Sequence, residues 1–147
     1  MSQQAEFGNC ECTRNDKTIV LRDAGSKNSQ SKLKLVNSKQ REIRIVKIDG
    51  CVIKAGKRCD TLVIFDWEDK ELYVEFKGNK VGQAVEQLEE TIKFICSRRN
   101  ARVKECIICT SRTPKTSTEI QKYKQKFKTS YQARLIVKSG QYSYPVS

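Results

Sequence analysis

The sequence predicts an α/β or α+β domain in which helices flank a mixed β-sheet. Strand-like segments fill the first half of the chain, and helical and strand-like segments alternate in the second half. The chain has 147 residues, a length that suits one domain with its own core. We therefore expect a single domain over residues 17–147. Residues 1–16 show no hydrophobic period and predict an irregular N-terminus.

Short segments rich in β-branched residues predict the strands of the first half. These segments are 18–21, 33–36, 43–48, 61–65 and 71–76. Gly-, Ser- and Asn-containing stretches separate the first three, as turns do. The last two flank the polar stretch 66–70, which is the pattern of a β-hairpin.

The hydrophobic period changes after Gly78. Apolar residues recur at three- and four-residue steps from Val81 to Ile95, which predicts an amphipathic helix over 81–98. Pro114 with Ser117 or Thr118 supplies the start of a second helix. The remaining predicted elements are a strand over 103–109, the second helix over 120–130 and a strand over 134–137.

Charge restricts the function of the chain. Lys and Arg number 29 against 17 Asp and Glu, which gives a formal net charge of +12, and there is no His. Imidazole-based mechanisms are therefore excluded, and the expected partner is a polyanion such as DNA or RNA. No apolar run approaches roughly 18 residues and the N-terminus lacks the layout of a secretory signal. We therefore expect a cytoplasmic protein without a membrane partner.

The seven cysteines are expected to be reduced thiols. The alternative is a tetrahedral zinc site formed by Cys10, Cys12, Cys106 and Cys109. Cys106 and Cys109 lie three residues apart in a predicted strand, so their side chains should point to opposite faces, which disfavours that site. The other three cysteines are expected to act as small apolar filler: Cys51, Cys59 and Cys96.

Asp60, Glu75 and Lys77 form the main candidate site. Alternation along a strand places Glu75 and Lys77 on one face, and the hairpin brings Asp60 opposite them. Two carboxylates gathered at the end of apolar strands are costly to bury unless a cation such as Mg²⁺ compensates their charge. The alternative is a solvated Glu75–Lys77 ion pair beside an Asp60 that serves only as a turn residue.

Phosphodiester hydrolysis needs carboxylates that hold Mg²⁺ or Mn²⁺, and a lysine that positions water or steadies developing charge. The sequence has Asp60, fourteen intervening residues, Glu75-Phe76-Lys77, and then a predicted helix and strand. This pattern resembles the PD-(D/E)xK nuclease superfamily, which includes restriction enzymes and Holliday-junction resolvases. The resemblance covers roughly residues 43–109.

The resemblance implies a restriction-endonuclease-like core, here with extra N-terminal strands. It also implies that Asp60, Glu75 and the Phe76 carbonyl are metal ligands and that Lys77 orients the attacking water. The sequence departs from the family pattern at Cys59, which stands where the family has Pro, and in its predicted N-terminal strands, which replace an acidic helix.

Several further polar and charged residues are candidates to lie near this site. Gln83 and Gln87 lie on the following helix, where related nucleases often place a polar residue near the site. Asp49 is either a third carboxylate ligand or part of a hairpin with solvated charges. Lys57 and Arg58, in the same connection, are candidates to contact phosphate.

Basic residues in the second half of the chain predict contacts with the nucleic-acid backbone. The candidates are Arg98, Arg99, Arg102, Lys122 and Lys126. The sequence thus predicts a metal-dependent DNA endonuclease, with RNA still open as the substrate. Cutting two strands requires two sites, which makes a homodimer a further expectation. The alternative is a non-catalytic nucleic-acid-binding or adaptor protein with the same fold.

Overall fold

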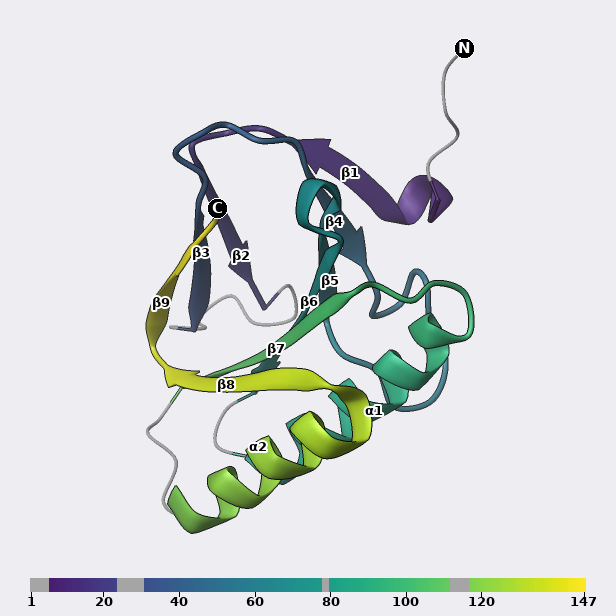
Figure 1. Ribbon diagram of the computed structural model, residues 1–147, viewed down its shortest axis with the longest axis vertical. Helices are drawn as coiled ribbons and strands as arrows, with labels where there is room; N and C mark the ends of the chain where they lie inside the picture. The colour runs from purple at the N-terminus through teal and green to yellow at the C-terminus, as the bar shows by residue number, and fades with distance from the viewer. Residues whose placement is uncertain (1–5, 24–30, 78–79, 112–116) are drawn as a thin grey trace.

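A six-stranded mixed sheet with strand order β1-β4-β5-β6-β7-β8 carries the candidate site (Figure 1). The computed structural model describes residues 6–23, 31–77, 80–111 and 117–147. The strands of this sheet are β1 (Glu11–Arg14), β4 (Ile43–Lys47), β5 (Thr61–Phe65), β6 (Lys70–Lys77), β7 (Val103–Thr110) and β8 (Ala133–Ser139). The sheet is antiparallel from β1 to β6 and parallel from β6 to β8.

The parallel half of the sheet follows from two helical crossovers. Helix α1 (Val81–Cys96) connects β6 to β7, and helix α2 (Ser117–Tyr131) precedes β8. A parallel pair of strands cannot be joined by a tight hairpin, so each crossover needs a long connection such as a helix. Short 3-10 turns lie at Gly8–Cys10 and Asp66–Glu68.

A smaller sheet covers the face of the large sheet that is opposite the helices (Figure 1). Its strands are β2 (Thr18–Arg22), β3 (Lys32–Val36) and β9 (Gln141–Pro145), in the order β2-β3-β9. Tyr73 of β6 packs in the cluster that contains Leu88 of α1 and Phe127 of α2. Val74 packs in the other cluster, with Leu33 of β3. The central sheet is therefore buried on both faces.

The structure confirms the α/β class, the mixed sheet and its flanking helices. The predicted hairpin is the antiparallel pair β5–β6, and the two predicted helices correspond to α1 and α2. Three features differ from prediction. Residues 11–14 form a strand where irregular structure was expected, β9 lies in a stretch without a prediction, and β2 and β3 belong to a separate sheet. Strand β1 pairs with β4 and β9 pairs with β3, and these partners are distant in sequence, so no local period reveals the pairings.

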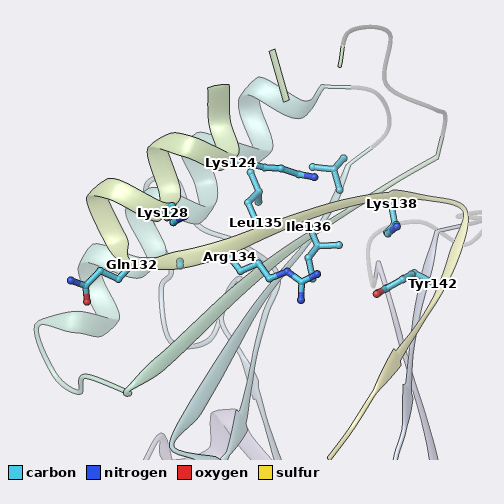
Figure 2. Close-up of a pocket in the computed structure, with 10 residues that line it drawn as sticks. Lys124, Lys128, Gln132, Arg134, Leu135, Ile136, Lys138 and Tyr142 are labelled. Atoms are coloured by element: carbon cyan, nitrogen blue, oxygen red, sulfur yellow. The ribbon is translucent and has the colours of Figure 1, made fainter. Parts of the chain in front are cut away.

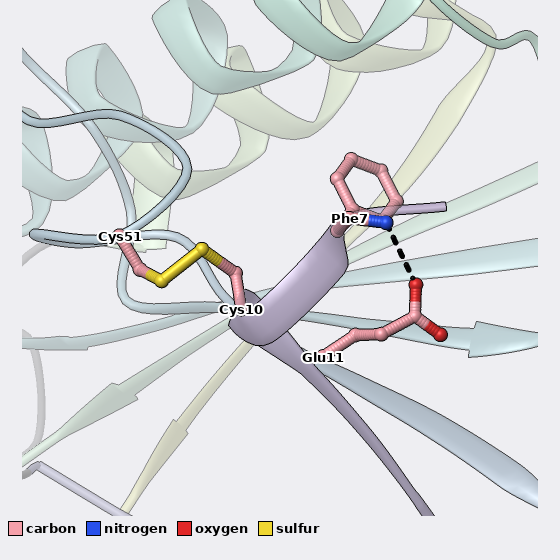
Figure 3. The surroundings of a disulfide bond; sticks show 4 residues. All are labelled: Phe7, Cys10, Glu11 and Cys51. Atoms are coloured by element: carbon pink, nitrogen blue, oxygen red, sulfur yellow. Dashed lines mark hydrogen bonds between the residues drawn. A yellow bond between two sulfur atoms is a disulfide. The ribbon is translucent and has the colours of Figure 1, made fainter. Parts of the chain in front are cut away.

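A disulfide corrects the expectation that all cysteines are reduced. Cys10 is bonded to Cys51, with a Cα–Cα distance of 5.7 Å (Figure 3). The pairing of β1 with β4 explains the bond, because it brings the start of β1 beside the segment that follows β4. The prediction missed the bond because it missed β1.

The disulfide also removes Cys10 from the alternative zinc site, which this structure does not form. Cys106 and Cys109 belong to clusters on opposite faces of the sheet, as strand alternation predicted. Cys59 is a buried thiol, but Cys96 is exposed and is therefore not core filler. Among the described residues, no helix combines the length and apolar character needed to cross a membrane.

Candidate active site

The structure brings Asp60, Glu75 and Lys77 together at one end of the large sheet. Asp60 directly precedes β5, whose first residue pairs with Val74, so Asp60 lies opposite Glu75. The Phe76 backbone N–H donates a hydrogen bond of 2.8 Å to Asp60 Oδ2. The Lys77 Nζ lies 3.7 Å from Glu75 Oε2. The hairpin register, set by apolar strand residues, thus fixes the spacing of the three charged groups.

Glu75 is the most unusual of the three because it is a carboxyl group in the core. Its side chain is only 2% exposed, and its Oε1 has no hydrogen-bond partner among the described residues. Burial, and then the neighbouring Asp60 carboxylate, raise the pKa of Glu75 to about 9, while Lys77 acts in the opposite direction. Glu75 therefore carries a proton at neutral pH unless a cation replaces it.

The pKa of Asp60 is also raised, chiefly by burial. Hydrogen bonding to Glu75 and to the Phe76 N–H opposes that shift. Two carboxylates that face each other and are poorly hydrated repel each other. The pair is therefore expected to share one proton. A divalent cation bound between them would stabilise both ionised forms.

The oxygen ligands available here suit Mg²⁺ better than a metal that takes all of its ligands from the protein. Among the described residues, no group of three or more His, Cys, Asp or Glu side chains is arranged to hold a metal ion. Mg²⁺ commonly binds one or two carboxylates and completes its shell with water and substrate phosphate oxygens. Asp60 and Glu75 can supply the carboxylates. The Phe76 carbonyl lies between Glu75 and Lys77 along the backbone and can supply a further oxygen.

The charged residues of the connection between β4 and β5 are paired with protein groups. Arg58 Nε lies 2.7 Å from Asp49 Oδ1, and that aspartate side chain is 51% exposed. Lys57 Nζ lies 2.6 Å from Glu86 Oε2 of α1. The charge of Asp49 contributes to the raised pKa of Asp60, so Asp49 is electrostatically close to the site. In this arrangement Asp49 is an ion-pair partner, and Lys57 and Arg58 contact carboxylates.

Helix α1 holds the segment that carries Asp60. The Gln87 Nε2 donates to the Arg58 carbonyl at 3.1 Å. The Thr91 hydroxyl accepts a hydrogen bond from the Cys59 N–H at 2.7 Å and donates to the Gln87 carbonyl at 2.8 Å. Gln87 therefore positions the loop before Asp60, and its buried Oε1 has no partner among the described residues. Gln83 is exposed on α1.

Two residues near the site were missed by the sequence analysis. Asp23 follows β2 in the small sheet, and its charge contributes to the raised pKa of Asp60. Thr91 is a buried hydroxyl on the apolar face of α1. Thr91 could have been noticed as a polar residue among the apolar positions of the helix. Asp23 had no such signal, because its position depends on where the small sheet packs.

The predicted arginine cluster lies at the other end of the sheet. The β6–β7 register runs from Lys70 paired with Val103 to Lys77 paired with Thr110, and the arginines precede Val103. Arg99 forms a 2.7 Å ion pair with buried Glu71. The two remaining arginines contact neighbouring groups: Arg98 stacks on Phe94, and the Arg102 N–H donates to Asp69. The Arg99 ion pair and the Arg102 backbone N–H therefore connect the segment after α1 to β6 and to the turn before β6.

The two predicted lysines of α2 are also outside the carboxylate centre. Lys126 Nζ lies 3.1 Å from Glu89 Oε1 of α1, and Lys122 is exposed.

Comparisons with protein-family models, curated proteins and solved structures give no significant match. The functional interpretation of the chain therefore depends on the chemistry of its own residues.

Proposed function

We propose that this chain is a divalent-metal-dependent endonuclease of the PD-(D/E)xK type that hydrolyses phosphodiester bonds of DNA. The observation that carries the proposal is the apposition of two largely buried carboxyl groups, Asp60 and Glu75, with Lys77 beside them at the end of the sheet. An isolated structural ion pair would not need the second carboxyl group. Burying both groups costs free energy that a bound cation can recover.

The order of elements around the site supports a restriction-endonuclease-like core. Asp60 and Glu75 lie on the antiparallel pair β5–β6, α1 follows, and β7 returns parallel to β6. This is the helix and strand that the resemblance requires after Glu75-Phe76-Lys77. Strand β1 and the small sheet are additions to that core.

In the proposed reaction, Asp60 and Glu75 hold Mg²⁺ or Mn²⁺. The bound ion would polarise the phosphate and acidify a water molecule. With a cation bound, Glu75 would act as an ionised carboxylate ligand, and Lys77, whose Nζ lies 3.7 Å from Glu75 Oε2, would lie beside the bound ion. Lys77 then orients the attacking water. Water adds across the P–O bond, and the leaving oxygen receives a proton.

A non-catalytic nucleic-acid-binding or adaptor protein is the second candidate. It is favoured by the absence of a three-ligand group among the described residues and by the contact of Lys77 Nζ with Glu75 Oε2 at 3.7 Å, which engages the lysine with a protein group. Such a protein would keep the fold and its net charge of +12 without turnover. Metal-dependent cleavage separates the two candidates.

The test compares the wild-type chain with Asp60→Asn and Lys77→Ala. Cleavage of circular duplex and single-stranded DNA is measured with Mg²⁺, Mn²⁺ or EDTA, and binding is measured in parallel. Lys47→Ala, which removes an exposed lysine of β4, is the matched control for Lys77→Ala. We expect metal-dependent cleavage by wild type and Lys47→Ala, and binding without cleavage by the other two. Tight binding by wild type without cleavage under any condition would support the adaptor function.

A further inference from the structure

A cationic groove follows the open edge of the large sheet. Strand β8 is the last strand of the sheet, and only β7 pairs with it among the described strands. A cavity of about 770 Å³ runs along this edge. Figure 2 shows α2, with Lys124 and Lys128, along one side of β8, and Lys138 and Tyr142 at the far end of the strand.

Positive charge dominates the surface of this groove. Its lining contains the cations Lys124, Lys128, Arg134 and Lys138, and none of its ten lining residues is acidic. Within the described part of the chain, no ion pair joins the three lysines to a carboxylate. Arg134 is 75% exposed and lies 3.6 Å from Glu105, whose carboxylate is closer to Lys70 at 2.7 Å. These cations are therefore available to an external anion.

The groove leads toward the catalytic end of the sheet. Lys77 pairs with Thr110 of β7, and Thr110 pairs with Ser139 of β8. Two strand spacings separate Lys77 from Ser139, which is about 10 Å. Ligands of open α/β sheets bind outside the carboxyl ends of the parallel strands, and this end is where the groove terminates. A chain lying along β8 would therefore arrive about two strand spacings from Lys77.

We propose that this groove binds a single-stranded polynucleotide in an extended conformation. The four cations would contact successive phosphates, and the ring of Tyr142 would provide a surface for base stacking. Lys138 lies 5.4 Å from the centre of that ring, so phosphate and base contacts are available at one point. The further step, that the bound strand is delivered to Asp60 and Glu75 for cleavage, rests on the proposed nuclease function.

An added protein strand fits the groove less well. Strand addition derives its specificity from pockets for alternate side chains. The aliphatic residues of the floor offer little such surface, because Leu135 is 3% and Ile136 is 7% exposed. A second copy of this chain would bring the same net charge of +12 to a cationic surface. A flexible polyanion needs no pockets for alternate side chains, and its charge is opposite to that of the groove.

The test measures binding separately from cleavage. The full-length chain carrying Asp60→Asn is titrated in EDTA with a labelled 20-nucleotide single strand, its duplex and a poly-glutamate peptide, at several salt concentrations. The groove variant is Lys124→Gln/Lys138→Gln. The control is Lys34→Gln/Lys39→Gln, which removes two exposed lysines from β3 and the turn after it. Thermal unfolding checks that each variant is folded.

We expect the single strand to bind best and the peptide not to compete with it. The groove variant should reduce the slope of log K against log salt by about 1.4, or about 0.7 for each lost phosphate contact, while the control keeps the wild-type slope. Tyr142→Ala should weaken single-strand binding about five- to a hundredfold and affect the duplex less. Equal losses in groove and control variants, or preferential binding of the duplex or the peptide, would overturn the proposal.

The same variants distinguish this proposal from the nuclease function. If the groove variant alone loses affinity and the wild-type chain never cleaves, the groove stands and the nuclease function fails. If the wild-type chain cleaves and the groove variant binds and cleaves equally well, the nuclease function stands and the groove proposal fails.

Discussion

At the scale of single residues, Glu75 determines how the site responds to pH. Its carboxyl group is buried beside Asp60, and its pKa is raised from 4.5 to about 9. The folded chain therefore holds a proton that the unfolded chain releases above its ordinary pKa. Stability from this group is fully present below about pH 4.5 and is lost as the pH rises toward about 9.

Glu75→Gln should remove this pH dependence. Glutamine keeps the shape of the protonated carboxyl group and cannot ionise. We expect the metal-free wild type to lose stability relative to Glu75→Gln between pH 5 and 9, by up to about 1.4 kcal/mol per pH unit. Urea unfolding at pH 5, 7 and 8.5 measures the difference. A constant difference between the two proteins across this range would show that Glu75 is ionised in the fold.

At the scale of elements, the site depends on how α1 docks against the loop before β5. The Thr91 hydroxyl bridges the two by accepting the Cys59 N–H, while it donates to its own helix. Without the Thr91 hydroxyl, the buried Cys59 N–H would have no hydrogen-bond partner. The free energy spent on removing that N–H from water would then not be recovered. Asp60 follows Cys59 directly, so a shift of this loop moves a metal ligand.

Thr91→Val should therefore destabilise the chain by about 1–3 kcal/mol and lower any metal-dependent cleavage. Thr129→Val is the matched control, because Thr129 is exposed on α2 and, among the described residues, its hydroxyl donates to carbonyls of its own helix. We expect that change to alter the free energy of unfolding by less than about 0.5 kcal/mol. Urea unfolding of both variants checks the contrast. Similar values for both would mean that the Thr91–Cys59 bond does not hold the loop.

At the scale of the whole molecule, the Cys10–Cys51 disulfide connects the N-terminal edge of the sheet to the segment that contains Asp49. The two cysteines are separated by 41 positions in the sequence. A cross-link over such a loop restricts the unfolded chain and stabilises the folded one.

The free energy of unfolding of the Cys10→Ser/Cys51→Ser variant should be about 2–4 kcal/mol lower than that of the oxidised wild type. Adding a thiol reductant should bring the wild type to the value of the variant and leave the variant unchanged. Thermal and urea unfolding with and without reductant measure both effects. An oxidised wild type as stable as the variant would show that the bond contributes nothing.

Local patterns predicted much of the large sheet and the centre of the candidate site. The hairpin at Asp60 and Glu75 was predicted because two apolar runs flank a polar stretch, and helix α1 was predicted because its apolar residues follow a period of 3.6. Strand β1, strand β9 and the approach of Asp23 were not predictable in this way. Each depends on contacts between segments far apart in the chain. The same limit explains why the ion pair between Arg99 and buried Glu71 was not predicted.

The two edges of the large sheet differ in a way that affects solubility. Strand β1 is short, and the disulfide anchors its start. Strand β8 is longer and carries Arg134 and Lys138. Charged side chains on an open edge keep other strands from adding to it by repulsion, and repulsion between exposed charges is screened by salt. Colloidal stability of the chain should therefore depend on ionic strength through β8, while the β1 edge resists aggregation through its covalent anchor.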